Sequence, residues 1–145
     1  MHADGEAQRA LDAAARAAQA AAGEAYNAAV ASGIDRATQG LLAEGYGYLA
    51  GENGDPGIAF DVLRTAALIA ADTGAPASDR AWRWSLAANA ADAFGQTESA
   101  LSNADAALSA LAERPEIDVQ DRPIAADMHY LRARILRTRG IVAAA

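Results

Sequence analysis

The chain has 145 residues, enough for one domain with a buried core, and 52% of them are apolar, although much of that fraction is alanine. A formal net charge of −7 disfavours general nucleic-acid binding, and the absence of cysteine excludes disulfides, thiolate nucleophiles and thiolate metal sites. Alanine favours helices, and Val, Ile and Thr are too scattered to indicate strands, so the composition predicts an all-α fold.

Residues 5–31 predict one long helix, or two helices broken at Gly23, with a stripe of mostly small side chains on one face. A second helix is expected after Asp35, a good N-cap residue, and runs to about Glu52. Glycine in a helix interior costs roughly 0.5–1 kcal/mol relative to alanine. The glycines of this helix therefore indicate that another backbone approaches closely, or else that the segment is loose; they occupy positions 40, 45, 47 and 51.

The next boundary is a turn at Asn53-Gly54, followed by Pro56 at a first helical position, where its missing N–H costs nothing. This third helix stops at Thr73-Gly74-Ala75-Pro76, and its predicted apolar face is Ala59, Val62, Leu63, Ala66, Ile69 and Ala70.

Ser78 or Asp79 is the predicted cap of a fourth helix, which contains Trp82 and Trp84 and ends before Gly95. Its successor is capped by Thr97 and carries Leu101, Ala104, Leu108 and Leu111 on one stripe. Residues 112–123 are expected to form a connecting loop too polar to bury. A last helix over 124–138 presents Ile124, Met128, Leu131 and Ile135, and an apolar end follows at 141–145.

The chain repeats itself when Gly54 is aligned with Gly95, an offset of 41 residues, and when Gly140 is brought onto Gly95 by a further 45. Small residues then recur at steps of seven, five and seven: Gly47, Ala88 and Ala133; the three turn glycines; Ala59, Ala100 and Ala145; and Ala66 with Ala107. Such positions let two helices of a hairpin approach, form the turn and seat the returning helix.

Residues 81–114 resemble a tetratricopeptide repeat (TPR). Trp84 stands at the tryptophan position of that family, Ala88 at its small position, Gly95 at its inter-helix glycine, and Ala100 and Ala107 at its second-helix alanines. Residues 40–73 match through their glycines and alanines but have no tryptophan. The spacings exceed the family period of about 34 residues and are nearer the long variant of kinesin-light-chain-like repeats.

The resemblance implies a short right-handed α-solenoid of antiparallel hairpins; an irregular multi-helix bundle is the alternative. We expect one helical domain over 1–145, made of an N-terminal helix at 5–31, TPR-like hairpins at 35–73 and 77–112, and an incomplete hairpin at 123–145.

In that family the first helices of the repeats line a concave groove. The positions carried over are Glu44, Tyr48 and Glu52 in the first unit, Trp82, Ser85, Asn89 and Asp92 in the second, and Asp127, Tyr130, Arg134 and Arg137 in the third. This wall would be acidic at one end, aromatic in the middle and basic at the other, which suits an extended or helical peptide of mixed charge. The alternative is that Trp82 and the tyrosines are ordinary core or rim residues.

The arginines at 132, 134, 137 and 139 are the main charge asymmetry. Two interpretations stay open: a contact with phosphate or an acidic peptide, or pairing with the acidic body of the domain.

The only histidines are His2 and His129, which argues against a multi-histidine metal site or a His-based triad, so we expect no enzyme, no cofactor and no metal. The sequence predicts a non-catalytic scaffold that binds a protein or peptide, with no nucleic-acid or membrane partner. The alternative is a self-associating piece of a longer helical-repeat protein, joined through Ile141-Val142. We expect a cytoplasmic location, or a periplasmic one if a leader was removed.

Overall fold

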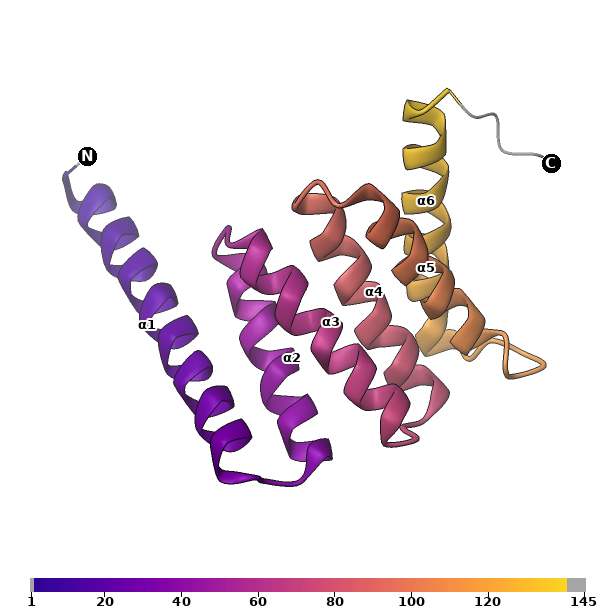
Figure 1. Ribbon diagram of the computed structural model, residues 1–145. Helices are drawn as coiled ribbons and strands as arrows, with labels where there is room; N and C mark the ends of the chain where they lie inside the picture. The colour runs from indigo at the N-terminus through magenta and orange to yellow at the C-terminus, as the bar shows by residue number, and fades with distance from the viewer. Residues whose placement is uncertain (1, 141–145) are drawn as a thin grey trace.

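The computed structural model describes residues 2–140, and in this part of the chain it is all-α, with six α-helices and one short 3-10 helix, η1. Each helix packs mainly against its neighbours in the sequence, so the helices cross the molecule in chain order from α1 to α6 (Figure 1). Their bounds are α1 His2–Ser32, α2 Arg36–Glu52, α3 Pro56–Asp72, α4 Ala77–Ala93, α5 Thr97–Leu111, η1 Val119–Asp121 and α6 Arg122–Thr138. No helix in residues 2–140 combines the length and the apolarity that crossing a membrane requires.

The turns after α1, α2, α3 and α4 are built alike. Each contains one glycine in the left-handed region, with φ of 71° at Gly33, 78° at Gly54, 67° at Gly74 and 76° at Gly95. At every turn the amide of the following residue bonds to the carbonyl five positions earlier, at 2.8–3.2 Å, which is the Schellman arrangement. The offset of 41 that relates Gly54 to Gly95 therefore joins two equivalent turns, and it joins Gly33 to Gly74 as well.

Because each tight turn reverses the chain, α2 and α4 run in the same direction. In the contacts between α4 and the segment around α6, the residue numbers increase in both partners: Ser78 contacts Asp121, Asn89 contacts Asp127, and Asp92 contacts Arg134. Hence α6 runs parallel to α4, and α2, α4 and α6 form one set of parallel helices.

The core is made largely of alanine, as the composition indicates. Five of the small residues matched in the sequence alignment are fully buried, namely Ala59, Ala66, Ala88, Ala100 and Ala107, whereas Ala133 is exposed. Larger side chains fill the space beyond them along the predicted stripes of α3 and α6, for example Leu63, Ile69, Met128, Leu131 and Ile135. The apolar faces predicted for α3 and α6 are thus confirmed.

Two of the glycines in α2 mark close packing. A Cβ on Gly47 would lie 2.5 Å from Leu63 Cγ, and one on Gly40 would lie 2.7 Å from Arg83 Nη1. A Cβ on Gly45 would meet open space. Close approach explains positions 40 and 47, and it does not explain position 45.

The helix α1 is continuous, so the break considered at Gly23 does not occur. The ring of Tyr46 lies against Gly23, 3.0 Å from where a Cβ would stand. The predicted apolar stripe of this helix is only partly covered, because α1 has 31 residues and its partner α2 has 17. Leu11, near the far end, is 65% exposed.

The prediction of a loop over 112–123 is partly wrong. The helix η1 begins at Val119 and α6 begins at Arg122. Asp121, the last residue of η1, is buried, and its carboxylate accepts a 2.6 Å hydrogen bond from the Ser78 hydroxyl. Neither Ser78 nor Asp79 is the cap of α4, because the helix begins at Ala77 and Pro76 stands at its N-cap position.

Thr97 was expected to cap the fifth helix but is its first residue, preceded by Gln96. The apolar end at 141–145, with the alignment position Ala145, lies outside the described residues.

Candidate peptide-binding groove

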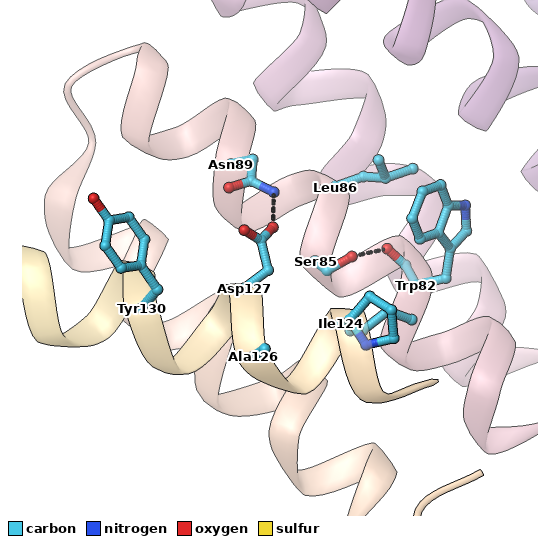
Figure 2. Close-up of a pocket in the computed structure, with 9 residues that line it drawn as sticks. Trp82, Ser85, Leu86, Asn89, Ile124, Ala126, Asp127 and Tyr130 are labelled. Atoms are coloured by element: carbon cyan, nitrogen blue, oxygen red, sulfur yellow. Dashed lines mark hydrogen bonds between the residues drawn. The ribbon is translucent and has the colours of Figure 1, made fainter. Parts of the chain in front are cut away.

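Two adjoining hollows lie along α2, α4 and α6. The larger, of about 560 Å³, lies between α4 and α6 (Figure 2). The smaller, of about 230 Å³, lies between α2, the start of α3, and α4. Both are lined by Leu86 and Asn89, so together they form one groove across the three parallel helices.

The two tryptophans of α4 point to opposite sides of the helix. Trp84 packs against two core clusters, one around Met128 and one around Leu63. Trp82, two residues earlier, is 42% exposed and lines the larger hollow. Trp84 therefore faces the core, where it is partly buried, and Trp82 faces solvent.

Aromatic rings stand at both ends of the larger hollow. Figure 2 shows Trp82 of α4 at one end and Tyr130 of α6 at the other, with Asn89 and Asp127 between them. The Asn89 side-chain amide donates a hydrogen bond of 3.3 Å to the Asp127 carboxylate, which links α4 to α6. Ser85 is buried, and its hydroxyl donates to the Trp82 carbonyl at 2.6 Å, so this hydroxyl already has an acceptor.

Apart from Arg137, the remaining predicted groove residues occupy three kinds of position. Tyr48 and Glu52 line the smaller hollow. Asp92 and Arg134 form an ion pair with each other and line a separate small hollow toward the end of α6. Glu44 forms an ion pair with Arg83, as described below.

Arg137 is exposed, lines neither part of the groove, and forms no ion pair within residues 2–140. The basic end anticipated for the groove thus contains an arginine that is already paired and another that stands apart.

The arginine cluster of α6 pairs with the acidic body of the domain. Arg132 Nε lies 2.7 Å from Asp105 Oδ1, and Arg139 Nη2 lies 2.5 Å from Glu98 Oε1. Together with Arg134 and Asp92, these pairs join α6 to α4 and α5. The interpretation of the cluster as partners of the acidic body is confirmed for these three arginines.

Sequence reasoning missed the apolar floor of the groove, formed by Leu86, Ile124 and Ala126. A helical step of four from Trp82 reaches Leu86, and a further step of three reaches Asn89, so this stripe could have been recognised. Arg83 was missed too. Its side chain is buried between helices and donates from Nε to Glu44 Oε1 at 2.9 Å and from Nη1 to the Ala66 carbonyl at 3.2 Å.

The groove offers aromatic and aliphatic surface, one amide and two carboxylates, which are groups suited to holding a chain segment. Among residues 2–140, no cluster of three or more His, Cys, Asp or Glu side chains could hold a metal ion. Comparison of the chain with models of protein families, with curated proteins and with solved structures found no match.

Proposed function

We propose that this chain is a short TPR-like α-solenoid that binds a protein segment or peptide along α2, α4 and α6. In such a solenoid the first helices of successive hairpins run parallel and line the binding face, while the second helices form the back. Here α2, α4 and α6 take the first role and α3 and α5 the second. The equivalent turns at Gly54 and Gly95 support a repeat of 41 residues.

The observation that carries the proposal is the orientation of Trp82. The core is already filled by Trp84, so the packing of the domain does not explain the position of a second tryptophan on α4. Trp82 is 42% exposed and lies over an apolar hollow. Tryptophan and tyrosine are enriched among the residues that dominate binding energy in protein interfaces. Tyr48 and Tyr130, which are also exposed, place further rings along the same groove.

A selection from a phage-displayed random-peptide library tests the proposal. We expect the wild-type protein to retain peptides whose binding is lost with Trp82→Ala and is unchanged with Leu68→Ala, which removes an exposed apolar side chain on α3, outside the groove. If the selected peptides bind Trp82→Ala as tightly as they bind Leu68→Ala, the proposal is contradicted.

A second candidate function, self-association, is favoured by one position in α6. Ala133 is exposed, whereas Gly47 and Ala88, its counterparts in α2 and α4, are buried against the returning helix of their hairpin. A second copy packed on this face would cover Ala133. Light scattering at micromolar concentrations tests it: a dimer that Ala133→Glu dissociates would support the candidate, and a monomer throughout would contradict it.

A further inference from the structure

We propose that the ligand of this groove is a cationic, apolar segment, one that carries Lys or Arg beside aliphatic or aromatic residues, and not a segment of mixed charge. This inference rests on the proposed function and adds the chemistry of the ligand. It follows from which charges line the groove and from which charges are already neutralised by partners in the domain.

Every charged side chain that lines the two hollows is acidic. Asp127 lies in the larger hollow and Glu52 in the smaller, and both are exposed. On α6, Arg134 pairs with Asp92, and Arg122, at the start of the helix, is exposed and lines neither hollow. Arg83 of α4 is directed into the core, where it pairs with Glu44. A ligand in the groove therefore meets two carboxylates and no cationic side chain from the lining.

The Asp127 carboxylate keeps acceptor capacity for such a ligand. Its Oδ2 accepts one hydrogen bond of 3.3 Å from Asn89, and an ionised carboxylate can accept about four hydrogen bonds in all. The bond to Asn89 also orients the group between Trp82 and Tyr130 (Figure 2). A Lys or Arg side chain placed there can donate to the carboxylate while its aliphatic stem lies on an aromatic face.

The rest of the lining selects apolar neighbours of the cationic residue. Leu86 separates the two hollows and belongs to both, and Ile124 and Ala126 add apolar surface on α6. A net charge of −7 over the whole chain also attracts cationic ligands, and this steering weakens as salt concentration rises.

The composition of the peptides selected in the display experiment provides the test. Peptides that depend on Trp82 should be enriched in Lys and Arg relative to the starting library and depleted in Asp and Glu. For one such synthetic peptide, Asp127→Asn should weaken binding by about two- to fivefold at low salt, as expected for an exposed ion pair, and the loss should shrink in high salt.

Asp61→Asn is the matched control, because it removes the same charge from an exposed site on α3 outside the groove, and it should change affinity by less than about twofold. Trp82-dependent peptides that are neutral or acidic, or that bind Asp127→Asn as tightly as wild type, would overturn the cationic ligand and leave the proposed function standing. A library that yields no Trp82-dependent peptide would overturn both.

Discussion

Arg83 of α4 reaches the Glu44 carboxylate of α2 with its Nε, at 2.9 Å, through a gap that exists because residue 40 is glycine. Its Nη1 donates to the carbonyl of Ala66 in α3, so one side chain joins three helices. The Arg83 residue is 9% exposed and Glu44 keeps more contact with water, so this pair forms where a core built of alanine leaves room for a long polar side chain.

We predict that Arg83→Met lowers the free energy of unfolding by about 1–3 kcal/mol, since hydrogen bonds to a charged group are lost and Glu44 is left without its partner. Urea unfolding followed by circular dichroism measures this loss. In a protein that already carries Glu44→Gln, Arg83→Met should lower the free energy of unfolding by less than it does in the wild type, because the ion pair is already lost. Strict additivity of the two substitutions would show that the pair contributes nothing.

Gly47 and Gly45 form a matched pair for testing the packing of α2 on α3. Gly47→Ala places a Cβ 2.5 Å from Leu63 Cγ and 3.2 Å from the Leu63 backbone nitrogen, and should destabilise the fold by about 1–3 kcal/mol. Gly45→Ala has open space around it and should stabilise by about 0.5–1 kcal/mol through helix propensity. Thermal unfolding of both variants checks the pair, and equal shifts in the same direction would contradict the close approach at position 47.

Trp84 and Trp82 should differ in what their removal does to stability. Trp84→Ala leaves a cavity between two core clusters and should cost about 3–5 kcal/mol. Trp82→Ala removes a half-exposed ring and should cost less than about 1 kcal/mol. Chemical denaturation of the two variants measures the difference, and a larger loss for Trp82 would reverse the register assigned to α4.

Two carboxylates make the stability of the fold depend on acid pH. Hydrogen bonds from Thr38, first from its backbone N–H and second from its hydroxyl, hold the pKa of the Asp35 carboxyl below its ordinary value. The Arg80 guanidinium lowers the pKa of the Glu113 carboxyl in the same way, through hydrogen bonds of 2.5 and 2.7 Å. A lowered pKa in the folded state means that the stabilisation is present above the unfolded pKa, about 4, and is lost as the pH falls through the folded value.

Glu113→Gln should therefore lower the melting temperature at pH 6, and the difference from wild type should narrow as the pH falls below about 4. Differential scanning calorimetry across this range measures the narrowing. A difference that stays constant with pH would exclude the ionised pair as its origin.

Much of the fold could be predicted because it depends on local chemistry. The turn glycines, the proline at position 56 and the apolar stripes of α3 and α6 each act over one or two helical turns, and the structure has the helices where they indicate. The two tryptophans could be sorted too, because residues two apart on a helix face nearly opposite sides.

What could not be predicted depends on contacts between distant residues. Buried Asp121 accepts a hydrogen bond from Ser78, which is 43 positions earlier, and buried Arg83 donates one to Glu44, which is 39 positions earlier. A polar loop and an arginine on a helix would otherwise be expected in solvent. The sequence predicted Arg134 and Asp92 as groove residues, but it did not predict the ion pair between them. That pair depends on how α6 lies against α4, which no local sequence pattern indicates.

The indole N–H resonances of the two tryptophans provide the most direct test of the groove. The chain has two such groups, one at Trp82 and one at Trp84, and Trp82→Phe assigns them in a proton–nitrogen correlation spectrum. On titration with a selected cationic peptide, we predict that the Trp82 resonance shifts progressively and the Trp84 resonance stays in place. Movement of the Trp84 resonance alone, or of neither, while the peptide binds would contradict a binding site on α2, α4 and α6.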